Sequence, residues 1–154
     1  MVAEHDQYDA LDGIRHEIKS YTNHPQYDLF AYDYDFSMIH LTLPVELGDR
    51  AVPACLPDLR FSDDKLVGKY LTVSGWGRLE NTEVGDYDYD YPTLLQSVDV
   101  PVVSQKDCRD AYEFTDVTNS MICAGNSFGG MGSCNRDSGG RVVFFGKMSD
   151  FLSC

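Results

Sequence analysis

Three features are scarce in this 154-residue sequence: positive charge, long apolar runs and closely spaced cysteine pairs. Lys and Arg number 12 against 25 Asp and Glu, which gives a formal net charge of −13. Such acidity argues against partners that need a basic surface, so we expect neither nucleic acid nor membrane among them. No apolar run reaches the length of a transmembrane helix. No CxxC pair is present, which argues against a zinc site.

The chain also lacks an apolar leader, although its cysteines are those of a secreted protein. MVAEHDQYDALDG at the start is acidic and has no apolar core of the kind found in signal peptides. Five cysteines are many for a cytosolic protein of this length, and an odd number leaves at least one without a partner. They stand at positions 55, 108, 123, 134 and 154. We therefore expect a secreted protein, and a truncated chain.

Helical periodicity is weak, and short apolar runs between turn residues dominate. These runs are rich in Val, Tyr, Phe and Thr, and Gly or Pro punctuates them, which predicts an all-β fold. They cover 36–45, 66–77, 94–103, 121–125 and 141–146. One short helix is predicted near 104–113, where Ser104 can act as the N-cap.

Six short sequence motifs, called words below, carry the resemblance to a known family. The most informative is GSCNRDSGG at 132–140, in which a serine stands between an aspartate and two glycines. In chain order the others are YDYDFSMIHL (32–41), VPACLP (52–57), VSGWGRL (73–79), LLQSVDVPVVSQKDC (94–108) and MICAG (121–125). In this order and spacing they closely resemble the chymotrypsin/trypsin family of serine endopeptidases, peptidase family S1.

The resemblance implies a chymotrypsin-like double antiparallel β-barrel that is incomplete in this chain. We expect the remainder of an N-terminal barrel at 1–48, a proline-rich connector at 49–65 and an incomplete C-terminal barrel at 66–154. The implied activity is proteolysis by acyl transfer through a Ser-His-Asp triad, with polypeptide substrates or protease inhibitors as partners.

Two members of the triad can be carried over from the family. Ser138 matches the nucleophile. Asp35 matches the carboxylate that orients the catalytic histidine, and Asp33 is its competitor. An aliphatic run directly follows the family's aspartate, which favours Asp35.

The catalytic histidine has no match. In the family it lies about 45 residues before the aspartate, a distance that would place it before Met1. None of the four histidines lies in a segment that resembles the family's motif around the catalytic histidine. They are His5, His16, His24 and His40. We therefore expect the chain to be inactive alone. The alternative is a non-catalytic homologue that acts as a binding or regulatory protein.

The loop around the nucleophile departs from the family. The oxyanion donors implied by the resemblance are the backbone N–H groups of Arg136 and Ser138, and Arg136 stands where the family has glycine. A side chain there restricts the backbone conformation. Asp137 matches the family's carboxylate that forms an ion pair with the amino terminus created by activation cleavage. Without that partner, we expect it to be solvated, protonated or paired differently.

The substrate pocket is implied at Gly132, Ser133 and Asn135. The pocket base determines the family's preference, and an acidic residue there selects Lys or Arg. Gly132 occupies that position, so a trypsin-type preference is not supported. Gly132 with Ser133 suits a larger apolar or mixed side chain.

The family also implies a disulfide between Cys108 and Cys123, which would contribute roughly 3 kcal/mol by restricting the unfolded chain. Cys55 matches a cysteine whose family partner lies in an absent segment, and Cys154 is a possible partner of Cys134. Another family disulfide is replaced by Leu71 and Phe144, which predicts an apolar contact between them.

We expect no cofactor and no metal site. An acidic loop at 4–17 matches the family's calcium-binding loop, and its carboxylates could bind Ca²⁺, but their spacing does not align cleanly and a solvated loop is the favoured reading. These carboxylates belong to Glu4, Asp6, Asp9, Asp12 and Glu17.

Overall fold

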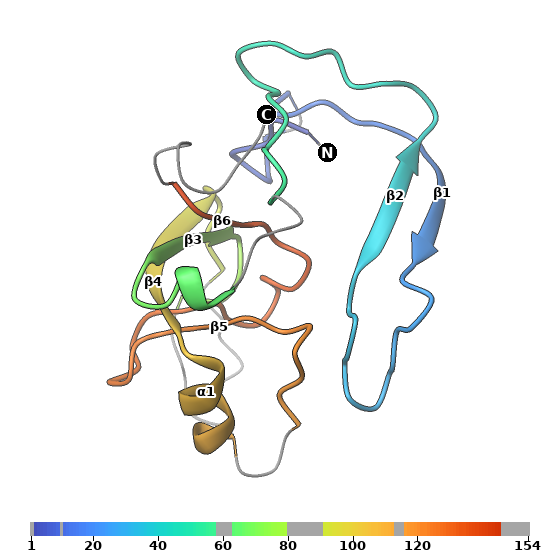
Figure 1. The fold of residues 1–154 in the computed structure, drawn as a ribbon. Helices are drawn as coiled ribbons and strands as arrows, with labels where there is room; N and C mark the ends of the chain where they lie inside the picture. Colours follow the sequence, from blue (N-terminus) through green and yellow to red (C-terminus); the bar gives the residue numbers. More distant parts are fainter. Residues whose placement is uncertain (1, 10, 58–62, 80–90, 113–115, 146–154) are drawn as a thin grey trace, which may run out of the picture.

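A computed structural model describes residues 2–9, 11–57, 63–79, 91–112 and 116–145. Strands dominate these residues, and one α-helix accompanies them, which confirms the all-β class (Figure 1). The strands are β1 (Ile18–Asn23), β2 (Ser37–Leu41), β3 (Tyr70–Gly75), β4 (Gln96–Val103), β5 (Cys123–Ala124) and β6 (Val142–Val143). The helix is α1 (Gln105–Ala111), and η1 (Asp63–Lys65) is a single 3₁₀ turn. Within the described residues no helix is long and apolar enough to cross a membrane.

The larger sheet has four antiparallel strands in the order β5-β4-β3-β6. Its central pair runs in register from Tyr70 opposite Pro101 to Gly75 opposite Gln96. This curled sheet, with α1 directly after β4, is consistent with an incomplete chymotrypsin-like barrel (Figure 1). The GWG word begins at Gly75, the last residue of β3, and the nucleophile loop precedes β6, so the topology places both at one end of this sheet.

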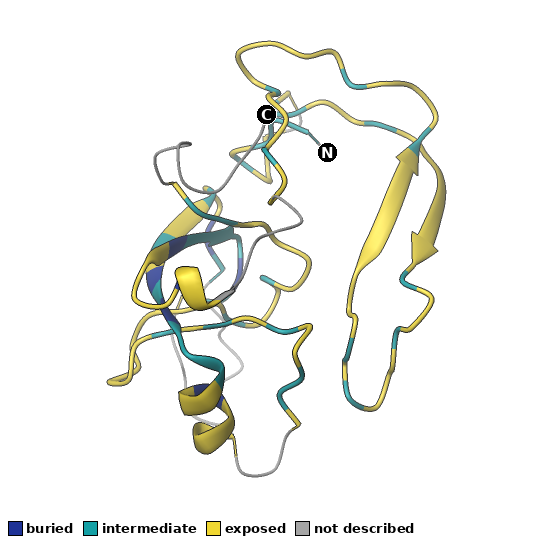
Figure 2. Ribbon diagram, viewed as in Figure 1, coloured by how far each residue is buried: buried dark blue, intermediate teal, exposed yellow. Residues whose placement is uncertain are grey.

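A small apolar core lies on one face of the four-stranded sheet. Side chains alternate between two faces of a strand, and β4 accordingly buries Val100 and Val102 while Asp99 stays exposed. Leu71 on β3 and Leu66 complete this face, and Phe144 packs against the cluster that contains Leu71, Leu66 and Val102. Figure 2 shows the buried residues around the four-stranded sheet and on α1, and none on β1 or β2. Phe144 thus packs on the cluster that contains Leu71, while the direct contact between the two stays a prediction.

The smaller sheet is the β1–β2 hairpin. Its strands pair antiparallel from Asn23 opposite Ser37 to Ile18 opposite Leu41, with an irregularity between Ile18 and Ser20. All of β1 is exposed, and so is β2 except Leu41 (Figure 2). Two strands without a packed face are marginally stable. The contacts at the ends of the hairpin therefore decide where it lies.

The predicted helix is present as α1. Ser104 is its N-cap, and its side chain accepts a hydrogen bond from the Asp107 amide at 3.0 Å. Cys108 on the buried side of α1 is disulfide-bonded to Cys123, with 6.2 Å between the two Cα atoms. The predicted disulfide is therefore present, and it closes the loop between α1 and β5. The predicted last residue of the helix, Glu113, lies outside the described residues.

The remaining expectations concern two cysteines and the domain boundaries. Cys55 is disulfide-bonded, whereas the family comparison leaves it without a partner in this chain. Cys154 lies outside the described residues. The boundaries at 1–48, 49–65 and 66–154 stay a prediction.

Candidate active site

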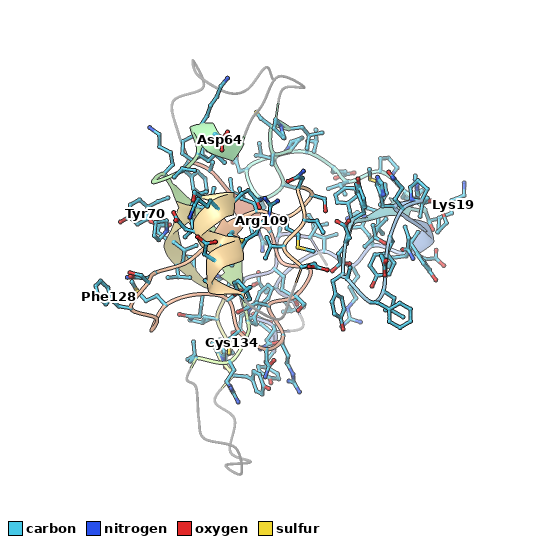
Figure 3. All side chains as sticks on the ribbon, turned by 60° about the horizontal axis from the view of Figure 1, so that its bottom comes forward. Lys19, Asp64, Tyr70, Arg109, Phe128 and Cys134 are labelled. Carbon is cyan, nitrogen blue, oxygen red and sulfur yellow. A yellow bond between two sulfur atoms is a disulfide. The ribbon has the colours of Figure 1, made fainter. Side chains whose placement is uncertain are left out.

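The nucleophile loop is built from two consecutive turns. The Asp137 amide donates to the Cys134 carbonyl at 3.0 Å, and the Gly140 amide donates to the Asp137 carbonyl at 2.9 Å. Ser138 follows Asp137 between these turns and is exposed. Cys134, labelled in Figure 3, is half-buried where the loop begins. The turns therefore leave Asp137 half-buried and present Ser138 to solvent.

The Asp137 carboxylate holds the loop against the end of β3. One oxygen accepts the Gly77 amide at 2.7 Å, and the other accepts the Cys134 amide at 2.8 Å. Each of these bonds has an ionised acceptor and is stronger than a neutral one. Asp137 is thus re-paired with backbone donors, which is one of the three outcomes expected from its missing family partner.

Glycine is required where this carboxylate meets the chain. A Cβ atom added at Gly75 or Gly77 would overlap the carboxylate of Asp137. The GWG word therefore has a local physical role, since it leaves room for Asp137 on both sides of Trp76. Sequence reasoning connected this word with the family but missed the donor Gly77; the paired glycines were the signal.

Arg136 adopts a backbone conformation that L-residues seldom take, with a φ of 77°. Its guanidinium carbon lies 4.1 Å from the centre of the Tyr91 ring, within range of a cation–π interaction. The residue that replaces the family's glycine thus keeps a glycine-like backbone, and its side chain rests on an aromatic ring.

Two backbone donors beside the nucleophile remain available. Among the described residues, the N–H groups of Arg136 and Ser138 donate to no acceptor, and the Ser138 hydroxyl has no hydrogen-bond partner. An oxyanion hole needs N–H donors that no acceptor within the protein occupies.

Two hollows meet at Ser138. One, of about 760 Å³, is lined by Ser138 together with Arg50, Trp76, Arg136 and Arg141. The other, of about 250 Å³, brings Gly132, Ser133 and Ser138 together with an apolar wall. That wall includes Leu71, Val73, Val100 and Val142. Asn135 does not line the second hollow, and its carbonyl instead accepts the Arg78 amide at 3.0 Å.

The two candidate aspartates of the YDYD word differ sharply. Asp35 is exposed just before β2, makes no hydrogen bond with its side chain among the described residues and lines neither hollow. Asp33 accepts hydrogen bonds from the hydroxyls of Thr118, at 2.6 Å, and Ser120. The structure therefore does not join Asp35 to Ser138, and it gives Asp33 specific partners instead.

No histidine lines either hollow with Ser138. The His5 carbonyl accepts the Trp76 indole N–H at 3.3 Å, and His24 stacks on Tyr34 with ring centres 4.7 Å apart. His40 lies on the exposed strand β2, opposite Ser20. His16 is half-buried, and its Nε2 atom has no hydrogen-bond partner.

The acidic loop does not assemble a cation site in the residues described. There, no group of three or more His, Cys, Asp or Glu side chains is arranged to hold a metal ion. Asp12 instead accepts the amides of His5 and Asp6 at 2.5 and 2.6 Å, and Arg50 at 2.6 Å. The Asp6 and His5 amides, followed by Arg50, lower the pKa of Asp12 to about 2.

Comparison with known proteins identifies the family. The sequence model of the Trypsin family matches residues 1–147. The chain belongs to the trypsin family. Serine protease 1 of Rattus norvegicus is 40% identical over 130 residues, which are 84% of this chain and 49% of the relative. Trypsin of Phaedon cochleariae is 37% identical over 145 residues, 94% of this chain and 53% of the relative.

A third relative is Serine proteinase stubble of Drosophila melanogaster, which is 38% identical over 125 residues. The match covers 77% of this chain and 14% of that protein. The chain thus spans about half the length, or less, of these curated relatives.

Proposed function

We propose that the protein is a serine endopeptidase that cleaves peptide bonds by acyl transfer, with Ser138 as the nucleophile. The observation that carries this proposal is the exposed Ser138 hydroxyl beside two unpaired N–H groups, on a loop held by Asp137. Membership of the trypsin family supports the same chemistry.

Ser138 attacks the carbonyl carbon of the substrate, and the oxygen takes on negative charge. The N–H groups of Arg136 and Ser138 then donate to this oxyanion. Donors of this kind each contribute roughly 3 kcal/mol to transition-state stabilisation because they are fixed before the reaction begins. The bonds from Gly77 and Cys134 to Asp137 fix them here.

A serine hydroxyl needs a base to take its proton at neutral pH. We propose that a histidine outside these 154 residues serves as that base, and that Asp35 orients it. The 154-residue chain alone is then inactive. The support is that none of its four histidines lines a hollow with Ser138.

The hollow of about 250 Å³ beside Ser138 is the proposed binding site for the side chain that precedes the cleaved bond. Gly132 brings no charge, and a Cβ placed there would meet open space. The aliphatic wall from β3, β4 and β6 favours a larger apolar side chain over Lys or Arg. Asp137 also lines this hollow, but each of its carboxylate oxygens already accepts a backbone amide. The partners are therefore polypeptide substrates and protease inhibitors. An extracellular location is proposed because two disulfide-bonded pairs of this kind persist in oxidising compartments.

The test is a hybrid in which a segment carrying the family's catalytic histidine is joined to residues 1–154. We expect hydrolysis of peptides with a large apolar residue before the cleaved bond. Ser138→Ala should lower kcat by about 10⁶-fold. Asp35→Asn should lower it by about 10⁴-fold, through loss of the histidine's orientation. A folded hybrid whose hydrolysis does not depend on Ser138 contradicts the proposal.

A second function, as a non-catalytic binding protein, is favoured by Arg136, whose side chain stands where the family has glycine. The hybrid separates the two functions. A binding protein would hold a protease inhibitor without hydrolysing peptides, and Arg136→Gly would not create turnover.

A further inference from the structure

The strands of the β1–β2 hairpin do not pack on the four-stranded sheet, so other contacts must hold the hairpin in place. The contacts of Asp33 with Thr118 and Ser120 are called the anchor below. All of β1 and most of β2 are exposed (Figure 2). The loop between the strands carries Asp33 and Asp35. We propose that Asp33 is a positioning residue, whose carboxylate ties the loop carrying Asp35 to residues 118–120.

The contacts at Asp33 cross a long stretch of sequence. Its Oδ1 atom accepts the Thr118 hydroxyl at 2.6 Å and the Ser120 hydroxyl, which lie 85 and 87 residues further along. The Tyr34 amide donates to the same carboxylate at 2.9 Å and lies 3.4 Å from Ser120 Oγ. Hydrogen bonds to an ionised acceptor are about twice as strong as neutral ones.

Further contacts within the loop between β1 and β2 hold Asp33 and Tyr34 in place. The Asp28 amide donates to the Asp33 carbonyl at 3.0 Å, and His24 stacks on Tyr34 with 6° between the ring planes. The Phe36 amide donates to the Tyr34 carbonyl at 2.7 Å. Because Asp35 lies between Tyr34 and Phe36, a displacement of Asp33 displaces Asp35.

Contacts from α1 hold residues 117–120, which contain the partners of Asp33. Arg109, labelled on α1 in Figure 3, donates to the Val117 carbonyl at 2.8 Å and to Asn119 at 2.7 Å. The Cys108–Cys123 disulfide closes the loop that contains residues 118–120. The anchor therefore runs from α1, through Thr118 and Ser120, to Asp33.

The electrostatics agree with this geometry. The hydroxyls of Ser120 and Thr118, then the Tyr34 amide and the charge of His24, hold the pKa of Asp33 below its ordinary value. Asp33 is thus the carboxylate of the YDYD word with fixed partners, and Asp35 is left exposed for another role.

The test is residue-resolved amide hydrogen exchange on the 154-residue chain. Asp33→Ala should accelerate exchange at Tyr34 and Ser120 about tenfold or more, because a hydrogen bond to a charged group is lost. Exchange in β3 and β4 should stay unchanged. Asp33→Asn keeps an acceptor oxygen, so it should restore much of the protection.

A matched control lies in the same loop. Asp28 accepts the amides of Phe30 and Ala31 but makes no bond to residues 118–120. Asp28→Ala should accelerate exchange at Phe30 and Ala31 and leave Ser120 as in the wild type. The pair Thr118→Val with Ser120→Ala should have a smaller effect at Tyr34 when Asp33→Ala is already present than in the wild type.

Two results would overturn the proposal: wild-type exchange at Tyr34 and Ser120 in Asp33→Ala, or full additivity with the Thr118 and Ser120 substitutions. The positioning role rests on the proposed function, whereas the anchor does not. In the hybrid enzyme, Asp33→Ala should lower kcat by up to about 10²-fold with KM unchanged, as expected from misplaced Asp35. A hybrid without Ser138-dependent activity would refute the proposed function and leave the exchange result standing.

Discussion

At the scale of single residues, Arg136 combines two opposing effects. A positive φ costs an L-residue roughly 1–2 kcal/mol relative to the right-handed region, and Arg136 has a φ of 77°. Its contact with the Tyr91 ring returns about 0.5–1 kcal/mol. The ring contact therefore offsets only part of the backbone cost.

Substitutions separate these effects. Arg136→Ala loses the ring contact and keeps the backbone strain, so it should destabilise the protein by about 0.5–1 kcal/mol. Arg136→Gly loses the contact but relieves the strain, so it should be more stable than the alanine variant by about 1 kcal/mol. Urea unfolding of the two variants measures this difference. An alanine variant at least as stable as the glycine variant would contradict the backbone conformation.

Asp12 predicts a dependence of stability on pH. Backbone donors and Arg50 lower its pKa from 3.8 to about 2. Because the folded-state pKa is lower than the unfolded one, its contribution is present above pH 3.8 and is lost as the pH falls towards 2. The free energy of unfolding should therefore fall less across this window in Asp12→Asn than in the wild type. Equal slopes in denaturant titrations would show that Asp12 lacks these partners.

At the scale of elements, α1 depends on its cap because it has only seven residues. Ser104→Ala removes the acceptor for the Asp107 amide and should cost about 1 kcal/mol. Ser104→Asp keeps an oxygen in place and should cost little. Thermal unfolding followed by circular dichroism compares them. If the alanine and aspartate variants melt alike, the cap contributes nothing.

Strands within apolar runs could be predicted from the sequence, and β1 could not. β4 lies within the predicted run 94–103, where Val98, Val100 and Val102 stand at every second position and the last two are buried. β1, with the sequence IKSYTN, was not among the predicted runs, because it is held by backbone pairing with β2 and buries no face. The short strands β5 and β6 lie within predicted runs, but nothing in their apolar pattern sets their length.

At the scale of the whole molecule, local words identified the loop around Ser138 but not its contacts. GSCNRDSGG indicated the candidate nucleophile. The hydrogen bond from the Gly77 amide to the Asp137 carboxylate could not be predicted, because the two residues lie 60 positions apart in the sequence. The competition between Asp33 and Asp35 could be posed from the sequence. The partners of Asp33 could not be found there, because Thr118 and Ser120 reach it only through the tertiary fold.

The central claim is that this trypsin-family chain holds a nucleophile and oxyanion donors without a working base. Treatment of the 154-residue chain with a fluorophosphonate tests it most directly, with mass spectrometry to locate the label and circular dichroism to verify folding. We predict no labelling of Ser138, because no base activates its hydroxyl. Stoichiometric labelling that disappears in Ser138→Ala would contradict the account.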